Sequence, residues 1–472
     1  MKRIQSKKKF CSNSKISKLS EDCLTHRLLD YNDVFVVYRR DNSTTARYYL
    51  GGLVKCEKGH ANMERMVEEV EGSNYKAYHH FISNSKWDYE ELISRISLDA
   101  SNLLEANKKL SKVATGYIID ESSHLKKGKK SIGVANQYAG VIGKIDNCQV
   151  AVYSSLVNDN RATIINEKLF LPKSWTADKH RCDRAKIPIQ NRTYKTKPEL
   201  ALDMIDEDVA RGVKFDWIGG DGLYGHNTQL THGLDDRDLF YVLDVHKDEL
   251  IFLKEPEIKI PEKKQGKGRR PKKLKAIGEH YRLDQYKDKL DDSDWIKELV
   301  RKTAKGWKKA YVHIAKVWVW DGKEDKARRR TLVITKTADK KPKIKYSLSN
   351  GNIDDYTNKE YAYFQAQRYW VERTFDDNKN ELGMSDYQIR NWIGWHHHQS
   401  LVMLASIFLL KEKIENEKEY PLMSTRDARI LIMFELFGTK EQYKLRMGQM
   451  KIRHMQRKKD IDRHYRYNEL WE

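Results

Sequence analysis

Three charged residues in the last third of the chain are spaced so that one helix would align them. Arg368, Glu372 and Lys379 occupy positions i, i+4 and i+11 in the segment RYWVERTFDDNKNELGMSDYQIRNW. At about 100° per residue, these positions fall within roughly 40° of one another. Such a helix would carry a stripe with one acid between two cations, and this stripe requires a charged partner.

Two aspartates stand where an α/β sheet can bring them beside the stripe. Asp120 ends the apolar segment YIID, and Asp221 follows the segment WIGG and precedes a glycine. Acids at strand ends in an α/β layer converge on one edge of the sheet, and a helix across that edge can add Glu372. Three carboxylates suit Mg²⁺, which prefers oxygen ligands, and two such ions can support in-line displacement at phosphorus.

Each of these acids also has an ordinary structural interpretation. An aspartate at the end of a strand is usually a turn former or a helix cap. A glutamate four residues after an arginine is commonly part of a solvated helix face. Spacing alone leaves the choice between metal binding and these structural roles open.

The composition favours a polyanionic partner. The 472 residues are 39% hydrophobic and 33% charged, and 89 Lys+Arg against 68 Asp+Glu give a net charge of +21. A positive field of this size attracts nucleic acid. The longest apolar stretch, LVMLASIFLL at 401–410, is too short to cross a bilayer, and the start MKRIQSKKKFCSNSK has no apolar signal core. We therefore expect a soluble cytoplasmic protein with no membrane partner.

Other metal-binding patterns in the sequence are weak. Five cysteines without a C-x-x-C pair indicate neither a disulfide framework nor a structural zinc site. CEKGH at 56–60 is interpreted as a turn, because no second Cys/His pair follows at finger spacing. His396, His397 and His398 would point about 100° apart on a helix and cannot share one ion, so we expect packing or a DNA contact.

The elements that would position the two aspartates follow from the hydrophobic pattern. Residues 1–110 predict short helices, and apolar β-branched segments after them predict strands. The predicted elements are strands at 117–120, 148–157 and 161–171, a helix at 196–213, a strand running into a glycine turn at 217–225, and a strand at 239–245. This order, β-β-β-α-β-β, indicates a mixed α/β layer.

Residues 247–350 interrupt this layer. Three β-like segments predict a small β insertion: 310–320, 330–336 and 343–350. The basic segment GKGRRPKK at 266–273 resembles a minor-groove arm, and a solvated basic loop is the equal alternative. We expect most of the tryptophans of the insertion to lie in its core: Trp295, Trp307, Trp318 and Trp320.

Helices are predicted after the insertion. Thr357 and Glu360 form a T-x-x-E capping box, and no Gly or Pro follows until Gly383, a residue type that often follows a helix end. One continuous helix should therefore carry the charged stripe and bury three aromatic residues, Tyr369, Trp370 and Phe375. A second helix, from residue 391 to about residue 411, should bury LVMLASIFLL against the first, and 440–466 should form a cationic helix or tail.

The stripe also carries a family resemblance. The spacing of Arg368, Glu372 and Lys379 resembles the Y-x2-R-x3-E-x6-K signature of the DDE transposases of bacterial insertion sequences. IIDESSHLKKGKKSIGVANQYAGVIGKIDNCQVAVYSSL resembles the region of the first Asp in one subgroup, and GGDGLYGHNTQL resembles its second Asp motif. NMERMVEEVEGSNYKAYHHFISNSKWD resembles the helical entry domain of that subgroup, so the resemblance spans most of the chain.

The resemblance implies a ribonuclease-H-like α/β fold, with a mixed sheet, flanking helices and a β-rich insertion. Asp120, Asp221 and Glu372 would be catalytic metal ligands for two Mg²⁺ ions, for which Mn²⁺ can substitute. The implied domains are a helical DNA-binding domain at 1–110, the first part of the catalytic core at 111–246, the insertion with its basic arm at 247–350, the second part of the core at 351–412, and a basic C-terminal region at 413–472.

The resemblance also implies DNA contacts. Arg368 and Lys379 would contact the phosphates of the transposon end. The signature Tyr falls at Gln365, so its role is performed differently or is missing. Further cations expected at DNA are Lys126, Lys127, Lys129 and Lys130 after the first Asp, and Arg269 and Arg270 in the basic arm.

We therefore expect a nucleoid-associated DNA transposase. It would bind terminal inverted repeats of double-stranded DNA as a homodimer or larger assembly, cleave the 3′ ends with divalent metal, and join them to target DNA. Two alternatives stay open at this point: a catalytically inactive, transposase-derived repressor, and a metal-dependent nuclease that does not join ends.

Overall fold

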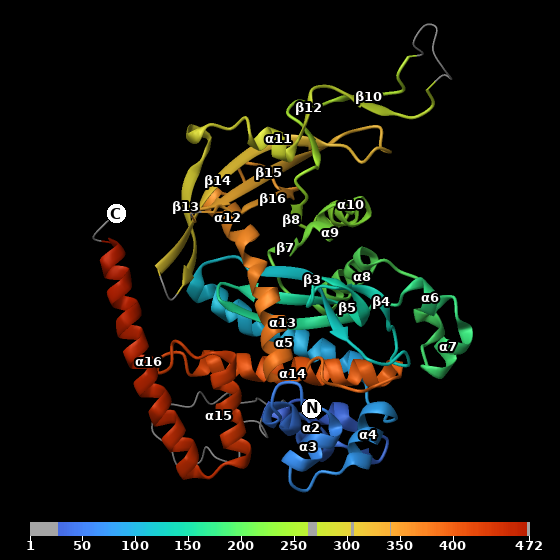
Figure 1. The fold of residues 1–472 in the computed structure, drawn as a ribbon, viewed down its shortest axis with the longest axis vertical. Helices are drawn as coiled ribbons and strands as arrows, with labels where there is room; N and C mark the ends of the chain where they lie inside the picture. The colour runs from blue at the N-terminus through green and yellow to red at the C-terminus, as the bar shows by residue number, and fades with distance from the viewer. Residues whose placement is uncertain (1–26, 263–270, 304–305, 340, 470–472) are drawn as a thin grey trace, which may run out of the picture.

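The fold is built around one long mixed β-sheet with helices packed at one end of it (Figure 1). The computed structural model describes residues 27–262, 271–303, 306–339 and 341–469. Helices from the beginning and the end of this described chain pack together below the sheet in Figure 1, where α14 and α15 contact α2. Segments far apart in the sequence are therefore neighbours in space.

Short helices form the N-terminal part, as predicted. Asn62, Asn74 and Asp88 each cap a helix, since their side-chain oxygens accept backbone N–H groups of the first turn. The CEKGH segment is a turn between two of these helices, also as predicted. The elements are η1 (Asn32–Phe35), β1 (Val36–Val37), β2 (Arg40–Asp41), α2 (Ser43–Lys55), α3 (Met63–Glu69), α4 (Tyr75–Ser83) and α5 (Tyr89–Ser111).

Five strands form the part of the sheet that carries the predicted aspartates. They lie in the order β6-β5-β3-β7-β8, in which β5 is antiparallel to β3 and β6, and β3, β7 and β8 are parallel. Their bounds are β3 (Gly116–Leu125), β5 (Lys144–Asn158), β6 (Arg161–Leu169), β7 (Trp217–Gly220) and β8 (Tyr241–Val245). Helix α8 (Lys197–Arg211) begins at a capping box of Thr196 and Glu199, so the predicted β-β-β-α-β-β order is confirmed.

Two features of this region differ from the prediction. Strand β3 continues to Leu125, so Asp120 lies in the middle of a strand and not at its end; the polar residues after it are buried, and the ring Nδ1 of His124 lies 2.9 Å from the hydroxyl of Tyr387. Strand β4 (Ala135–Ala139), with the sequence ANQYA, pairs with β5 although it has no β-branched residue. The remaining elements here are α6 (Lys173–Thr176), α7 (Lys179–Arg184), η2 (Ile189–Asn191), α9 (Gly222–Gly225) and α10 (Thr228–Asp235).

The predicted β insertion extends the same sheet. Strands β14 (Gly306–Val319), β15 (Arg328–Thr337) and β16 (Ile344–Ser349) confirm the three predicted segments, and β16 pairs antiparallel with β8. The hydrogen-bonded ladder is therefore continuous from the insertion into the strands that carry the aspartates. The further elements are β9 (Leu250–Phe252), β10 (Glu257–Lys259), β11 (Lys275–Ile277), β12 (His280–Arg282), α11 (Leu283–Lys287), η3 (Asp292–Asp294) and β13 (Ile296–Thr303).

The basic arm and the tryptophans of the insertion have different outcomes. Residues 263–270, which include Arg269 and Arg270, lie outside the described residues; the flanking strands β10 and β11 pair and project from the body of the molecule (Figure 1). The prediction of core tryptophans is wrong. Trp307 is 43% exposed, and the other three, Trp295, Trp318 and Trp320, are only half-buried, because the insertion has one small core and a largely open surface.

The helix that carries the charged stripe is interrupted. Its N-terminus is the predicted capping box of Thr357 and Glu360, but α12 (Asn358–Gln367) ends before Arg368 and α13 (Tyr369–Glu381) begins after it. Tyr369 is 41% exposed, and its ring centroid lies 3.8 Å from the guanidinium carbon of Arg301, so the predicted burial of Tyr369 is wrong. Phe375 is buried as predicted, and Trp370 is half-buried.

The last helices hold the lower part of the molecule together. Helix α14 (Trp392–Glu415) begins at the cap Asn391 and buries the whole of LVMLASIFLL, as predicted, but it packs chiefly on α5 and β6 and not on the helix before it. Helices α15 (Thr425–Phe437) and α16 (Lys440–Glu469) follow, and the predicted cationic segment is helical. In the part of the chain that the structure describes, no helix combines the length and apolar character that crossing a bilayer requires.

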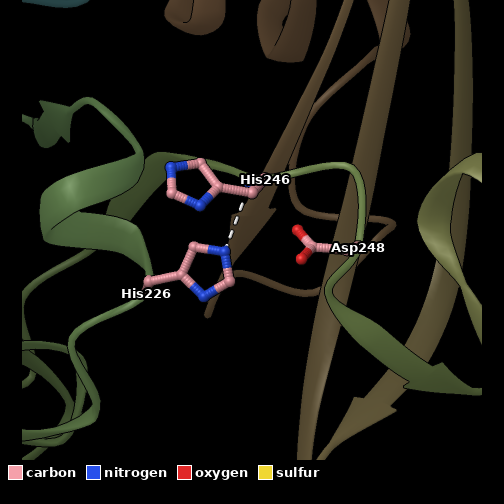
Figure 2. Close-up of side chains that lie close together, drawn as sticks. All are labelled: His226, His246 and Asp248. Atoms are coloured by element: carbon pink, nitrogen blue, oxygen red, sulfur yellow. Dashed lines mark hydrogen bonds between the residues drawn. The ribbon is translucent and has the colours of Figure 1, made fainter.

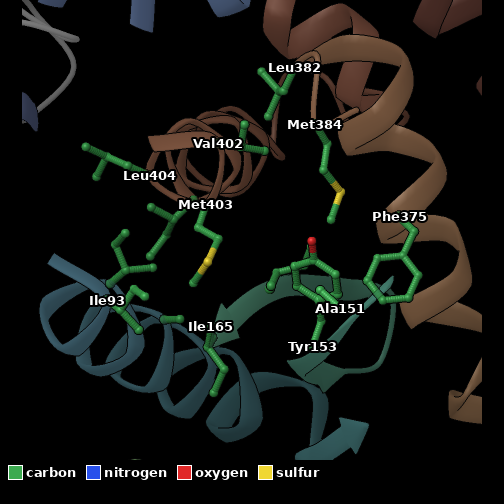
Figure 3. Packing of buried hydrophobic residues seen from close by; sticks show 14 of the residues in the cluster. Ile93, Ala151, Tyr153, Ile165, Phe375, Leu382, Met384, Val402, Met403 and Leu404 are labelled. Carbon is green, nitrogen blue, oxygen red and sulfur yellow. The ribbon is translucent and has the colours of Figure 1, made fainter. Parts of the chain in front are cut away.

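The main core lies between the sheet and these helices (Figure 3). Phe375 of α13 packs against the ring of Tyr153 on β5, with ring centroids 5.4 Å apart. Met403 of α14 points toward Ile93 of α5 and Ile165 of β6 in Figure 3. This packing fixes α13 across the face of the sheet.

Candidate active site

The register of the parallel strands aligns three aspartates. Ile119 of β3 pairs with Gly220 of β7, and Gly220 pairs with Leu243 of β8. The next residue on each strand path is an aspartate: Asp120, Asp221 and Asp244. Residues in register on neighbouring strands point to the same face, so these three carboxylates lie in a row.

Arg368 links Glu372 of α13 to this row of aspartates. Its guanidinium Nη1 lies 3.4 Å from Oδ2 of Asp120, and its Nη2 lies 2.9 Å from Oε1 of Glu372. Its Nε lies 3.3 Å from Oδ2 of Asp244. The break between α12 and α13 thus falls at Arg368, whose guanidinium contacts Asp120, Asp244 and Glu372.

The carboxylates differ in their surroundings. Asp120 is only 8% exposed, and burial raises its pKa to about 7, against the opposing effect of the Arg368 guanidinium. The charge of Asp221 adds to this rise, which indicates that the two aspartates interact. The side chain of Glu372 is 54% exposed and faces solvent beside the buried row. The site therefore has a buried inner side and an accessible outer side.

Asp221 has a second, structural role. Its Oδ1 accepts the backbone N–H of Leu223 at 2.9 Å and caps the short helix α9. Among the residues that the structure describes, none donates a hydrogen bond to its other carboxylate oxygen, Oδ2. The structural interpretation and the ligand interpretation of Asp221 are thus compatible.

Two of the three predicted ligands, Asp120 and Glu372, form ion pairs with the Arg368 guanidinium in this structure. Among the described residues, Asp120, Asp221 and Glu372 form no group whose ligand atoms all lie within 4.8 Å of one another. Arg368 lies between Asp120 and Glu372, and a divalent ion would compete with it for the same oxygens. The donor set consists of carboxylate oxygens and fits a hard ion once the guanidinium has moved.

Two other groups of described side chains are close enough to share an ion. In the first, His226, His246 and Asp248 converge (Figure 2), but the ring of His226 is already engaged on both sides. Its Nδ1 lies 2.8 Å from Glu249, and its Nε2 accepts the backbone N–H of His246 at 3.1 Å. We interpret this cluster as a hydrogen-bonded turn.

The second group contains His232, Asp321 and Glu324. Arg328 donates two hydrogen bonds to Glu324, and the backbone N–H groups of Lys323 and Glu324 donate to Asp321. Both acids are therefore occupied by the turn between β14 and β15. Neither of these two groups includes a residue predicted to bind metal.

The predicted DNA-binding cations lie in different environments. Lys379 Nζ donates to the carbonyl of Ser123 at 3.2 Å, and burial lowers its pKa to about 8. Lys126 Nζ donates to the carbonyls of Ser385 and Tyr387, at 3.1 Å and 2.8 Å, which ties the loop after β3 to the chain beyond α13. Lys127, Lys129 and Lys130 on the same loop are exposed.

The three consecutive histidines pack, as predicted. The ring Nδ1 of His396 lies 2.6 Å from Glu167, and His397 contacts the carbonyls of Ile82 and Trp87. His398 contacts the hydroxyl of Tyr49 and the carbonyl of Gly383. The three rings thus point to three different partners.

The sequence reasoning missed Asp244. The signal was present, because LFYVLDV places an acid at the end of an apolar strand just as WIGGD does. Gln365 at the signature Tyr position is buried, and its Nε2 donates to Ser347 Oγ at 2.7 Å. Ser347 in turn donates to Asp244 Oδ1 at 2.6 Å, so Gln365 is linked to the row of aspartates.

Three comparisons relate the chain to known proteins. The family model for the DDE superfamily endonuclease matches residues 22–311, a range that includes Asp120, Asp221 and Asp244 and ends before Glu372. A probable transposase for insertion sequence element IS701 of Microchaete diplosiphon is 26% identical over 321 residues, covering 68% of this chain and 70% of that protein. A chain of a piggyBac transposase synaptic complex with hairpin DNA matches with a TM-score of 0.40 and 11% identity, over 92% of this chain and 81% of that chain.

Proposed function

Because the chain belongs to the DDE superfamily endonucleases, we propose that it is a transposase whose catalytic carboxylates are Asp120, Asp221 and Glu372. The observation that carries the proposal is the placement of these acids on the sheet and beside Arg368. Ile119 pairs with Gly220, and Asp120 and Asp221 are the next residues along the chain; Arg368 forms ion pairs with both Asp120 and Glu372. The similarity to the IS701 transposase supports the proposal that the protein is a transposase.

The strand order supports a ribonuclease-H-like core. Three antiparallel strands, β6, β5 and β3, are followed by the parallel strands β7 and β8, and α13 crosses the face that carries the acids. In this arrangement the insertion enters after β8 and returns through β16. The domains at 111–246 and 351–412 then form one catalytic unit, with 247–350 as its insertion.

The acid set suits divalent metal, and Mg²⁺ is the ion we propose, with Mn²⁺ as a substitute. Asp120, Asp221 and Glu372 would hold it, and the bound ions would activate the attacking oxygen and stabilise the leaving one. Cations of the chain would position the substrate: Lys379 on α13, and Lys127 and Lys129 on the loop after β3, where both are exposed, would supply the positive charge.

The proposed substrate is double-stranded DNA. The protein would bind terminal inverted repeats, cleave the 3′ ends, and transfer them into target DNA. The net charge of +21 provides the attraction to the phosphate backbone. Because two ends must be cut together, a homodimer or larger assembly on DNA is proposed, and a protein with this substrate would be associated with the nucleoid.

The proposal is tested with a duplex that carries the ends of the encoding element. Incubation with Mg²⁺ or Mn²⁺ should give 3′-end nicking followed by strand transfer. Glu372→Gln should abolish both while end binding stays within about twofold, because the exposed carboxylate is replaced by a similar side chain. End binding by the wild type without any cleavage would support a repressor, and cleavage without joining would support a nuclease.

A further inference from the structure

Asp244 forms an ion pair with Arg368 but is not among the predicted metal ligands. It contacts Nε of the guanidinium, whereas Asp120 and Glu372 contact the two terminal nitrogens. Nε is buried and makes no aligned hydrogen bond, so the contact with Asp244 is an ion pair at 3.3 Å. Burial lowers the pKa of Arg368, and the neighbouring carboxylates, Asp244 foremost, raise it above its ordinary value.

Asp244 is itself held from behind. Its Oδ1 accepts the hydroxyl of Ser347 on the paired strand β16, at 2.6 Å, and Ser347 accepts the amide of Gln365 at 2.7 Å. The carbonyl oxygen of Gln365 accepts the hydroxyl of Thr335, and all of Thr335, Ser347 and Gln365 are buried. The chain of contacts runs from the insertion strands β15 and β16 through α12 to the row of aspartates.

This arrangement has an electrostatic consequence for the site. The Arg368 guanidinium forms ion pairs with three carboxylates. Its contacts with Asp120 and Glu372 must break before the oxygens of these two acids can bind a divalent ion. Leaving Arg368 buried without any counter-charge is costly. A third carboxylate that keeps its contact with Arg368 lowers this cost.

We propose that Asp244, fixed by Ser347 and Gln365, is a positioning residue. It keeps its ion pair with the Arg368 guanidinium when Asp120 and Glu372 bind divalent metal instead. This inference rests on the proposed function, because it takes those two acids as metal ligands. It also gives Gln365 a role at the signature Tyr position: Gln365 orients Ser347, and Ser347 orients Asp244.

Calorimetric titration of the full chain with Mn²⁺ alone, without DNA, tests this role. Asp244→Asn should weaken Mn²⁺ binding roughly tenfold, the low end of the range for groups that orient metal ligands. Gln365→Met, which removes no charge, should weaken it in the same direction and by less. Asp354→Asn is the matched control, because this exposed acid belongs to neither of the two other groups that could share an ion, and its substitution removes the same charge. It should change Mn²⁺ affinity by less than about twofold.

A double-mutant cycle separates positioning from simple charge. If Asp244 acts through Arg368, then Asp244→Asn in an Arg368→Gln background should change Mn²⁺ affinity by less than about twofold. An equal loss in both backgrounds would overturn the proposal, because Asp244 would then attract the ion directly. Unchanged affinity in the single variant would overturn it as well. Lys345, the other buried cation beside Asp244, stays constant across the cycle.

Glu372→Gln distinguishes the two ways in which this account can fail. If Glu372→Gln loses Mn²⁺ affinity and Asp244→Asn does not, only the role of Asp244 is wrong. If Glu372→Gln binds Mn²⁺ as the wild type does, the proposed carboxylate site is wrong and the inference falls with it. Thermal unfolding of each variant identifies any substitution that lowers Mn²⁺ affinity by unfolding the chain. If Asp244→Asn unfolds the chain, Gln365→Met tests the role of Asp244 in its place.

Discussion

At the residue scale, Arg368 compensates only part of the charge around it. Four carboxylates surround the guanidinium or influence it, namely Asp120, Asp221, Asp244 and Glu372. Fully ionised, they would exceed its charge by three. The excess favours cations, and the partly buried position of the row strengthens that preference. The same guanidinium occupies the oxygens that an ion would bind.

This balance predicts opposite effects of Arg368→Gln on two measurements. Mn²⁺ affinity should rise severalfold, because the competing cation is gone, and cleavage of DNA ends at saturating Mn²⁺ should fall at least tenfold, because a proposed phosphate contact is lost. Calorimetry and an end-cleavage assay measure the two effects. Arg373→Gln is the control, since Arg373 lies on the same helix and pairs with Asp377. A fall in Mn²⁺ affinity for Arg368→Gln would contradict the competition.

At the element scale, Gly383 ends the helix that carries the site. Its φ is +61°, and a Cβ on it would lie 2.2 Å from the Cβ of Ala61 in the N-terminal part of the chain. The position therefore combines a left-handed backbone with close packing. It ties the end of α13 to the turn before α3.

Gly383→Ala should lower the free energy of unfolding by about 2–4 kcal/mol, from backbone strain plus overpacking. Gly59→Ala is the matched control, because Gly59 also has a positive φ, +81°, with nothing within 4 Å of its added Cβ. It should cost only about 1 kcal/mol. Urea unfolding of both variants measures the difference, and equal losses would show that the packing against Ala61 does not matter.

Much of the element structure follows from local sequence signals. The capping boxes at Thr196 and Thr357 and the β-branched strands at β5 and β15 act through neighbouring residues, so the sequence predicts them. The break at Arg368 has no local signal, since neither Gly nor Pro is near it. It coincides with ion pairs to residues 120 and 244, which are distant in sequence.

At the scale of the whole molecule, α14 connects the N-terminal helices to the end of α13. His398 on α14 is fully buried; its Nδ1 lies 2.8 Å from the hydroxyl of Tyr49, and its Nε2 lies 3.2 Å from the carbonyl of Gly383. A neutral ring satisfies both contacts by accepting from Tyr49 and donating to Gly383. Burial lowers the pKa of His398 to about 3.

Stability should therefore depend on pH below neutrality. The unfolded ring has a pKa near 6.5, so above that pH both states are neutral and the full stability is present. As pH falls from about 6.5 toward the folded pKa of about 3, only the unfolded state gains a proton, and stability is lost. Between pH 6.5 and 4.5 the loss should be on the order of 2 kcal/mol.

Urea unfolding at a series of pH values measures this loss. His398→Gln keeps a hydrogen-bonding side chain and removes the titration, so its profile should be flatter than that of the wild type over the same range. Parallel profiles for the two proteins would contradict the role of His398. Their offset at pH 7 reports the cost of the substitution itself.

The pairing of strands that are distant in sequence could not be predicted from the sequence. The pairing of β16 with β8 joins residues about a hundred positions apart, and the hydrophobic pattern within either strand does not predict it. That pairing brings Ser347 to Asp244, which explains why the contact between them could not be predicted. Position and spacing alone leave the roles of Asp120, Asp221 and Glu372 open, so their proposed roles as metal ligands come from the family resemblance of the segments around them.

We propose that Asp120, Asp221 and Glu372 share one divalent-metal site. Fe²⁺ substituted for Mg²⁺ reacts with added hydrogen peroxide to give Fe³⁺, hydroxide and a hydroxyl radical; the radical cuts the polypeptide next to the bound ion, and mass spectrometry locates the cuts. We predict cleavage near residues 120, 221 and 372, which excess Mg²⁺ suppresses and Glu372→Gln abolishes. Cleavage confined to the His226, His246 and Asp248 cluster, or to His232, Asp321 and Glu324, would contradict the claim.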